Sequence, residues 1–335
     1  MKILIIGTGS IGLRHGRILR EAGYGVALCP MRPERSEELA AAGWTCLPPS
    51  STSMHSLKEL ARYGVTHAVV ASNTSLHVQQ TLSLASQGIH TLVEKPLSLS
   101  MEDGRKLLGS AEPGQPMSPG HTASLYCGLT LRFSQSLRAF RDMVPRAGRL
   151  HAVDIECRSW LPGWRPGSDY RASYSASARE GGVLRDLVHE IDYAGWIFGW
   201  PRQVFAQLSV TDRLGIAADE QAHLHYVMAD GLCVRLGLDY LTRTPRRRCI
   251  AYGSDGTLTW DGIASSVTWE APGKTSEVTT FTQTRDEMLL AQDIAFLQDK
   301  TDELVGLSEA LRSIVVCDAA RLSSNSQRME NVATT

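Results

Sequence analysis

The first twelve residues constrain the fold of this chain more than any other stretch. Four consecutive apolar residues, Ile3 to Ile6, predict a strand that is buried on both faces. The chain then turns through Gly7-x-Gly9-x-x-Gly12 and continues into a helical run, Leu13 to Ala22. A buried strand, a glycine-rich turn and a helix in this order predict the first βα unit of a doubly wound α/β fold.

The three glycines of this turn have different physical tasks. Gly7 permits the tight turn, Gly9 lets the backbone approach a pyrophosphate, and Gly12 lets the helix pack closely on the strand. The free N–H groups and the positive dipole end of the helix, at Ser10 and Ile11, would face the phosphates. The sequence therefore predicts a dinucleotide-binding domain at the N-terminus.

Length and composition predict a soluble protein of two domains. A chain of 335 residues exceeds the usual size of one domain, and 43% hydrophobic residues suffice for substantial cores. A formal net charge of −1 gives no overall field that would attract nucleic acid or a membrane surface. The N-terminus reads as a core strand and no apolar run approaches about 20 residues, so we expect neither a signal peptide nor a membrane span.

The seven cysteines predict a cytoplasmic location. They are scattered, odd in number and mostly inside apolar runs, as is typical of buried, reduced thiols. No CxxC occurs, and no cysteine–histidine cluster has the spacing of a zinc site, so we predict no metal.

Polar residues follow several strands predicted in the first half. Because ligands of an open parallel sheet bind at the carboxyl ends of its strands, we expect these residues to gather in one crevice. The predicted strands are Gly25–Cys29, His67–Ala71 and Thr91–Val93, and the predicted helices include Ser36–Ala42, Ser56–Tyr63 and Met101–Ala111. The predicted cofactor-binding residues are Gly7, Gly9, Ser10, Ile11, Gly12, Arg32, Ser72, Asn73, His77, Glu94 and Lys95.

The end of the second strand bears on which dinucleotide binds. An NAD site usually has an acid there, which binds the ribose hydroxyls. This chain has Pro30-Met31-Arg32-Pro33-Glu34-Arg35, with no acid before Glu34. Arg32 and Arg35 would suit a 2′-phosphate, which favours NADP; alternatively they begin a solvated helix, and the cofactor is NAD.

A stretch rich in proline and glycine, Glu112 to Gly120, marks either the end of the first domain or a loop just before its last strand, and a second domain follows. We place the boundary between residues 123 and 124. The predicted strands of the second domain are Val204–Val210, Ala222–Met228, Gly231–Tyr240, Cys249–Tyr252 and Gly256–Trp260, and its closing helices are Arg285–Asp299 and Glu303–Ser323. The run Arg246–Arg248 reads as a solvated strand edge or a subunit contact rather than a nucleic-acid patch.

Several motifs resemble the Gfo/Idh/MocA family (glucose–fructose oxidoreductase, inositol dehydrogenase and rhizopine catabolism). Glu94-Lys95-Pro96 follows a strand, as in that family, and the glycine turn precedes it. Gly181-Gly182-x-Leu184-x-Asp186-Leu-x-His189-x-x-Asp192 matches the helix that carries the family's catalytic histidine. Leu131-Arg132-Phe133 resembles the strand that enters the substrate domain, and the resemblance covers residues 1 to about 325.

The resemblance implies a Rossmann domain at residues 1–123 and a substrate-binding α+β domain at residues 124–335. The second domain is expected to have a large, open, mostly antiparallel sheet with helices on one face. The bare face commonly forms the oligomer interface, so we expect a homodimer or homotetramer. An unpartnered face of this size would expose more apolar surface than monomers usually tolerate.

The resemblance also implies hydride transfer between a nicotinamide and a secondary alcohol or ketone. His189 would be the base, because its ordinary pKa of about 6.5 is close to working pH. Lys95 would hold the substrate hydroxyl, polarise the carbonyl and exchange the proton with His189. Asp186 precedes His189 by three residues, on the same face of one helix, and would share its role. Glu94 would bind the nicotinamide ribose.

The expected substrate is a sugar, nucleotide-sugar or cyclitol, since aromatic faces and bidentate donors suit such rings. The segments Trp164–Arg171 and Asp239–Arg247 resemble members found with nucleotide-sugar or surface-glycan pathways, which favours biosynthesis over catabolism. Two other functions stay open: a nucleotide-sensing regulator without catalysis, and a reductase of an imine or linear tetrapyrrole. The expected substrate-binding residues are Arg132, Trp164, Arg165, Tyr170 and Asp192.

Overall fold

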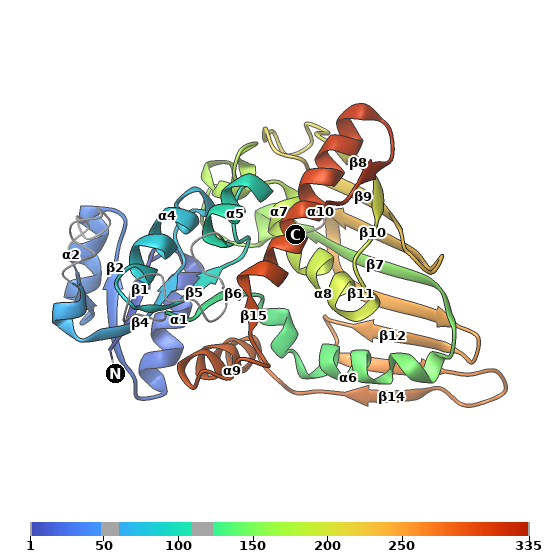
Figure 1. Cartoon of the computed structure of the whole chain (residues 1–335), viewed down its shortest axis with the longest axis horizontal. Coiled ribbons are helices and arrows are strands. Elements are labelled where there is room, and N and C mark those ends of the chain that lie inside the picture. The colour runs from blue at the N-terminus through green and yellow to red at the C-terminus, as the bar shows by residue number, and fades with distance from the viewer. Residues whose placement is uncertain (1, 48–59, 109–122, 334–335) are drawn as a thin grey trace. The chain divides into compact units, whose positions relative to one another are not determined.

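The computed structural model describes residues 2–47, 60–108 and 123–333 (Figure 1). They divide into two compact units, which are described separately. The first comprises residues 1–130 and 285–311, and the second comprises residues 131–284 and 312–335. Among the described residues, no helix has both the length and the apolar character needed to cross a membrane.

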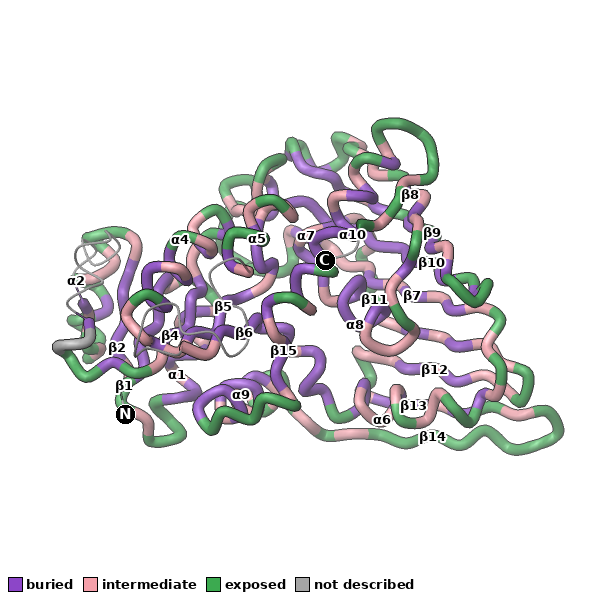
Figure 2. The backbone as a smooth tube through the Cα atoms, in the orientation of Figure 1, coloured by how far each residue is buried: buried purple, intermediate pink, exposed green. Residues whose placement is uncertain are grey.

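The first unit is built on a parallel sheet with the strand order β15-β6-β5-β4-β1-β2-β3. Only the edge strand β15 runs antiparallel to its neighbour, β6. Strand β1 lies between β4 and β2, and Ile3 to Ile6 are fully buried, as predicted from their apolar run (Figure 2). The strands are β1 (Lys2–Ile6), β2 (Gly25–Cys29), β3 (Thr45–Cys46), β4 (Val65–Val70), β5 (His90–Glu94), β6 (Leu125–Gly128) and β15 (Val305–Gly306).

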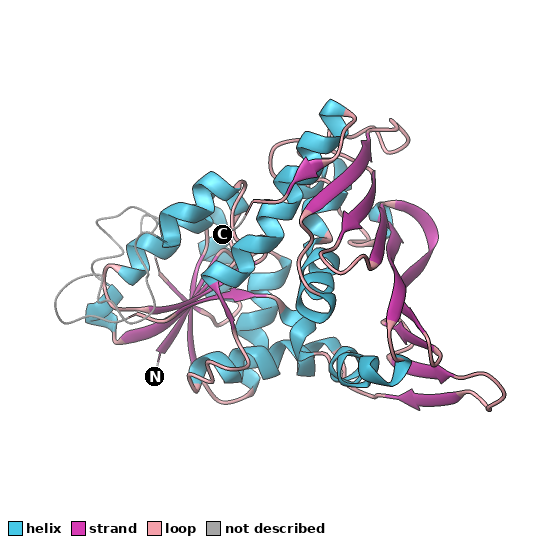
Figure 3. Ribbon diagram, turned by 45° about the vertical axis from the view of Figure 1, so that its right-hand side comes forward, coloured by secondary structure: helices cyan, strands magenta, loops and turns pink. Residues whose placement is uncertain are grey.

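Helices alternate with these strands, so the unit is a doubly wound Rossmann domain, as predicted (Figure 3). The helices are α1 (Ser10–Glu21), α2 (Pro33–Ala41), α4 (Thr74–Ala85), α5 (Met101–Leu108), α9 (Arg285–Leu297) and a short 3₁₀ turn, η2 (Leu60–Tyr63). The predicted loop at 112–120, the beginning of the predicted helix 56–63 and the end of the predicted helix 101–111 lie outside the described residues.

The predicted division of the chain differs from these units in two respects: the first unit extends to residue 130 instead of 123, and it includes residues 285–311. We assigned the closing helices to the second domain, but α9 packs on α1, and β15 extends the Rossmann sheet. The reason is that α9 carries acidic side chains that pair with α1, as described below. Helix α10 (Leu307–Ser326) begins in the first unit and continues into the second.

The second unit is built on a sheet with the order β14-β13-β12-β11-β7-β10-β9-β8-β16. Its neighbouring strands run antiparallel except for β7 and β10, which confirms the predicted large, mostly antiparallel sheet. The strands are β7 (Leu150–Trp160), β8 (Gln203–Ser209), β9 (Gln221–Val227), β10 (Cys233–Asp239), β11 (Leu241–Gly253), β12 (Thr257–Asp261), β13 (Ser266–Glu270), β14 (Glu277–Thr280) and β16 (Glu330–Asn331).

Helices cover one face of this sheet through α6 (Gln135–Met143), α7 (Val183–Asp186) and α8 (Val188–Phe198). Two predictions about these segments are wrong. Leu131-Arg132-Phe133 is part of a 3₁₀ helix, η3 (Thr130–Phe133), rather than a strand. The single helix expected to carry both Asp186 and His189 is interrupted at Leu187, whose φ of −97° and ψ of 30° separate α7 from α8.

The uncovered face of the sheet is polar, which contradicts the apolar face expected from the sequence. One row across neighbouring strands contains His225, Arg235 and Asp154. The guanidinium of Arg235 donates to both carboxylate oxygens of Asp154, at 2.7 and 2.8 Å. The adjacent row contains Glu156 and Arg248. Alternating charges therefore leave this face without the apolar excess that would by itself demand a partner.

The run Arg246–Arg248 lies inside β11 and is not a solvated edge. Arg247 points to the helix-covered face, where its guanidinium donates to both oxygens of the buried Glu190 at 2.6 and 3.1 Å. This bidentate pair between the half-buried Arg247 and the buried Glu190 joins β11 to α8, the helix that carries His189. Arg248 faces the opposite side and binds Asp261. Two of the three arginines are therefore committed to ion pairs within the unit.

Candidate active site

The glycine turn between β1 and α1 has the geometry predicted from its sequence. Gly7 adopts φ +88°, where an L side chain is strained, and a Cβ there would lie 2.5 Å from the carbonyl oxygen of Ala71. A Cβ on Gly12 would lie 2.0 Å from the carbonyl oxygen of Gly7. A Cβ on Gly9 would meet no protein atom within 4 Å. Gly7 and Gly12 are therefore required by the fold itself, whereas the space at Gly9 is open to a ligand.

A pocket of about 640 Å³ opens beside this turn. It brings together three of the predicted cofactor residues, Gly9, Ser10 and Arg32. Arg32 is exposed and occupies the N-cap position of α2, while Arg35 is paired with Glu38 at 2.5 Å. A phosphate in this pocket would meet the first amides of α1 and the Arg32 guanidinium. The remaining lining residues are Thr8, Leu13, Glu34, Arg35 and Glu38.

Two of the polar residues after β4, Ser72 and His77, form hydrogen bonds within the first unit. Ser72 donates from its hydroxyl to Gln80 at 2.6 Å, and Asn73 is exposed at the N-cap of α4. The buried ring of His77 lies between two backbone carbonyls, 2.9 Å from that of Pro96 and 3.1 Å from that of Ser72. His77 therefore joins the end of β4 to the turn after β5, and its contact with the cofactor stays a prediction.

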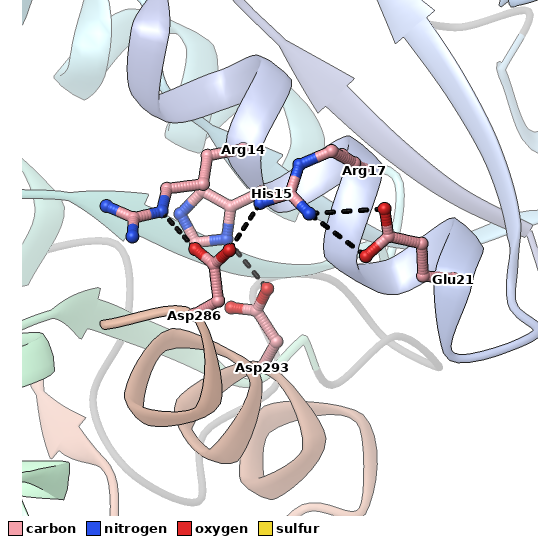
Figure 4. A network of polar contacts seen from close by, with 6 residues as sticks. All are labelled: Arg14, His15, Arg17, Glu21, Asp286 and Asp293. Atoms are coloured by element: carbon pink, nitrogen blue, oxygen red, sulfur yellow. Dashed lines mark hydrogen bonds and ion pairs between the residues drawn. The ribbon is translucent and has the colours of Figure 1, made fainter. Parts of the chain in front are cut away.

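Glu94 ends β5 and is held inside the unit. Its side chain is 7% exposed, and its Oε1 lies 3.1 Å from Nε2 of His15 on α1. The other ring nitrogen of His15, Nδ1, lies 2.7 Å from Oδ2 of Asp293 on α9. Figure 4 shows His15 directed from α1 to Asp293, with Arg14 and Arg17 both reaching Asp286 nearer the surface.

The two carboxylates keep His15 charged. Burial alone would lower the pKa of His15, but the charge of Asp293 and the hydrogen bonds to Asp293 and Glu94 outweigh it and raise the pKa to about 10. Both ring nitrogens are then donors, as the two acceptors require. Lys95 follows Glu94 directly and is half-buried at the carboxyl end of β5, the same edge of the sheet as the glycine turn.

The second unit holds the other two predicted catalytic residues. Asp186 is the last residue of α7 and His189 lies in the first turn of α8, so the two do not share one helix. The buried hydroxyl of Tyr240 donates to Oδ2 of Asp186 at 2.6 Å. The carboxyl of Asp186 is thereby fixed from the sheet beneath it, and α8 begins four residues before the Asp192 that pairs with Arg132.

Arg132 and Asp192, both predicted to bind substrate, bind each other. The guanidinium of Arg132 donates from Nε at 2.9 Å and from Nη2 at 2.6 Å, and the two side chains are 6% and 1% exposed. Trp196 lies over the guanidinium at 5.2 Å. This arrangement is that of a buried ion pair that connects η3 to α8.

The segment after β7 presents the three other predicted substrate residues. Trp164 is 37% exposed, and its ring meets the buried Tyr240 edge-on at 5.4 Å. Arg165 is exposed near the ring of Tyr174. The hydroxyl of Tyr170 donates to the carbonyl of Leu214 at 3.0 Å, which fixes this side chain within the loop. Trp164 and Arg165 are the two that remain accessible.

Sequence reasoning missed His15, Asp293 and Tyr240, which hold the predicted residues in place. A signal for the first two exists. His15 lies three residues after Gly12 on the inner side of a helix, and Asp293 stands in the apolar run Met288–Leu297. Buried polar groups need partners, so each position indicates a paired charge. The sequence does not say which residue pairs with which.

Two family models match the chain. The model described as an oxidoreductase family with an NAD-binding Rossmann fold matches residues 1–116, and the GFO/IDH/MocA C-terminal domain matches residues 139–259. The chain belongs to the Gfo/Idh/MocA oxidoreductase family. This confirms the family resemblance seen in the Glu94-Lys95-Pro96 and His189 motifs.

Curated relatives of this family member match over part of their length. Myo-inositol 2-dehydrogenase of Thermotoga maritima is 27% identical over 228 residues, which cover 65% of this chain and 62% of the relative. 2,7-Anhydro-N-acetylneuraminate hydratase of Mediterraneibacter gnavus is 24% identical over 196 residues, or 58% of this chain and 48% of the relative. The chain thus spans about half to three-fifths of these relatives.

The fold is shared with solved structures over the whole chain. Levoglucosan dehydrogenase in complex with NADH superposes with a TM-score of 0.84 and covers 100% of both chains, at 13% identity. At this identity the similarity establishes the architecture of the family member: a Rossmann domain joined to a domain with a large open sheet.

The different roles of Gly9 and Gly12 predict different effects of alanine. Gly12→Ala places a methyl group against the Gly7 carbonyl, so we expect a loss of unfolding free energy of about 2 kcal/mol or more. Gly9→Ala meets no protein atom and alters only the N-cap, so it should cost about 1 kcal/mol or less while weakening dinucleotide binding. Urea denaturation and ligand titration measure both effects; equal destabilisation by the two variants would contradict the assignment.

The raised pKa of His15 predicts how stability depends on pH. Because its pKa rises from about 6.5 in the unfolded chain to about 10, its contribution is complete below pH 6.5 and is lost as the pH approaches 10. Burial also raises the pKa of Asp293, which acts in the same direction. Between pH 7 and 9, the unfolding free energy of the wild type should fall more steeply than that of His15→Gln, by up to about 1 kcal/mol per pH unit.

Urea denaturation of both proteins at several pH values measures the two slopes. His67, whose pKa burial lowers to about 4, and Cys157, whose pKa burial raises to about 12, are present in both proteins, so their contributions cancel in the difference between the two slopes. Parallel slopes for the two proteins would show that His15 is not a buried imidazolium.

Proposed function

We propose that this protein is a nicotinamide-dependent oxidoreductase that interconverts a secondary alcohol and a ketone on a sugar, nucleotide-sugar or cyclitol. Membership of the family is the observation that carries the proposal, since the chain has both Lys95 after β5 and His189 at the start of α8. A regulator that only senses a nucleotide would need neither side chain.

The first unit offers a fitting place for the cofactor. The open space at Gly9, the free amides at the start of α1 and the guanidinium of Arg32 suit a pyrophosphate and an adenosine phosphate. When bound, the nicotinamide accepts or returns the hydride. Arg32, with no acid at the end of β2, favours NADP over NAD.

Lys95 and His189 are proposed to handle the proton and the developing charge. The ammonium of Lys95 would donate a hydrogen bond to the substrate oxygen, orient the hydroxyl and stabilise negative charge on it. His189 would take the hydroxyl proton as general base. Asp186, fixed by Tyr240, would support the start of α8, from which His189 projects.

The substrate class follows from the accessible side chains and from the relatives. The exposed Trp164 offers an aromatic face for a ring, and Arg165 offers paired donors for a phosphate or carboxylate. Relatives are named for myo-inositol and for an anhydro-sugar acid. We place the reaction in biosynthesis, and we expect homodimers or homotetramers joined through charged rows on the open sheet.

Lys95→Ala tests the proposed chemistry. Turnover is followed by absorbance of the reduced nicotinamide, with NADP(H) and NAD(H), over a panel of cyclitols, sugars and nucleotide sugars. We expect kcat to fall at least about 100-fold while cofactor affinity stays within about threefold, because the ammonium acts on the substrate oxygen. Lys106→Ala, at an exposed lysine of α5, is the control. Unaltered turnover in Lys95→Ala would contradict the mechanism.

Analysis of the reaction products distinguishes an oxidation or reduction of the substrate from a hydration. A reaction that converts substrate without net change of nicotinamide absorbance would instead assign hydratase chemistry, as in the name of the Mediterraneibacter relative.

Arg32→Ala tests the cofactor preference. Loss of a charge-assisted pair to a phosphate costs about 1.5–3 kcal/mol, so we expect the Kd for NADPH to rise about 10- to 100-fold, with little change for NADH. Lys106→Ala is the control, because Lys106 is an exposed cation that does not line this pocket. A wild type that binds NADH more tightly, with no effect of Arg32→Ala, would assign NAD.

A further inference from the structure

We propose that His15 and Asp293 are positioning residues for Lys95: a buried imidazolium between two carboxylates fixes Glu94 and with it the turn that carries Lys95. This inference rests on the proposed function, in which Lys95 acts on the substrate. It adds to that function two buried residues from helices α1 and α9, and it reassigns Glu94 from a cofactor ligand to an anchor.

The anchor consists of His15, Asp293 and Glu94, and all three side chains are buried. His15 is 0% exposed, and its two ring nitrogens are 2.7 Å from Asp293 and 3.1 Å from Glu94. The side chain of Asp293 is 1% exposed and that of Glu94 is 7% exposed. An ionised carboxylate at such depth is costly unless it is paired, so Glu94 is held to His15 for as long as α1 and α9 stay packed.

Strand β6 also restricts the position of the Glu94 side chain. A Cβ on Gly128 would lie 2.7 Å from Oε1 of Glu94 and 3.5 Å from its Cα. The carboxylate therefore lies against the bare backbone of the neighbouring strand, where no larger residue fits. Glu94 is thus fixed from α1 through His15 and from β6 through Gly128.

The residue after Lys95, Pro96, also contacts a buried histidine. The ring of His77, 1% exposed on α4, lies 2.9 Å from the carbonyl oxygen of Pro96. Two buried imidazoles from different helices thus bracket Lys95, one through Glu94 and one through Pro96. The proposed role of Lys95 needs a defined position for its ammonium, because misplacement of a catalytic group by about 1 Å can cost about 100-fold in rate. Contacts on both sides of Lys95 in the chain provide this position.

A simpler role for His15 would be to join α1 to α9, and the chain provides a control for it. Arg14 and Arg17 on α1 also pair with α9, through Asp286 (Figure 4), but these side chains are 35–43% exposed. Asp286→Asn therefore weakens the same helix pair without touching the anchor. Asp293→Asn breaks the charge at the anchor and keeps an oxygen that accepts from His15.

The experiment compares the wild type, His15→Gln, Asp293→Asn and Asp286→Asn. Lysines are dimethylated with ¹³C-formaldehyde and observed by NMR, which is practical because the chain has six lysines and Lys95→Arg identifies the Lys95 signal. Unmodified samples give kcat, KM and the Kd of NADPH. We expect His15→Gln and Asp293→Asn to shift the Lys95 signal and lower kcat at least about 10-fold, with the Kd within about threefold, and Asp286→Asn to change neither.

The outcomes separate the two proposals. An unchanged Lys95 signal in His15→Gln and Asp293→Asn would overturn the positioning role, as would an equal change in Asp286→Asn. If His15→Gln does not fold, Asp293→Asn decides alone. A shifted Lys95 signal in a protein without turnover on the panel would support the anchor and reject the proposed reaction.

Discussion

The structure of the first unit depends on a charged histidine, His15, that is fully buried. His15 carries its proton between Asp293 and Glu94, and removal of His15 would leave two buried carboxylates without their counter-charge. The interaction joins the helix after the glycine turn, the strand that ends before Lys95, and a helix almost 280 residues later. It also explains why α9 belongs to the Rossmann unit although the chain has by then traversed the second sheet.

The second unit follows the same principle with other residues. Three pairs attach α7 and α8 to their surroundings: the buried pairs Arg132–Asp192 and Tyr240–Asp186, and the partly buried pair Arg247–Glu190. His189 lies among these anchored residues in the chain, between Asp186 and Asp192. Both residues proposed for catalysis thus project from backbone that buried hydrogen bonds hold in place, which is the support that a precise site requires.

Local patterns in the sequence predicted the elements well and their partners poorly. The apolar run Ile3–Ile6 and the glycine turn indicate β1 and α1 because burial and backbone freedom are properties of the residues themselves. The pairs Arg132–Asp192 and His15–Asp293 join residues 60 and 278 positions apart, and only the fold decides them. The break at Leu187 and the polar open sheet face also depend on tertiary packing, and the family resemblance did not carry either feature.

The central claim is that Lys95 and His189 act on one substrate oxygen beside a bound nicotinamide. A crystal structure with NADPH and a substrate from the panel tests it most directly. The claim predicts a substrate oxygen about 3 Å from both Nζ of Lys95 and a ring nitrogen of His189, with the reacting carbon facing the nicotinamide. A nicotinamide bound away from Lys95, or a His189 ring turned to bulk solvent, would contradict it.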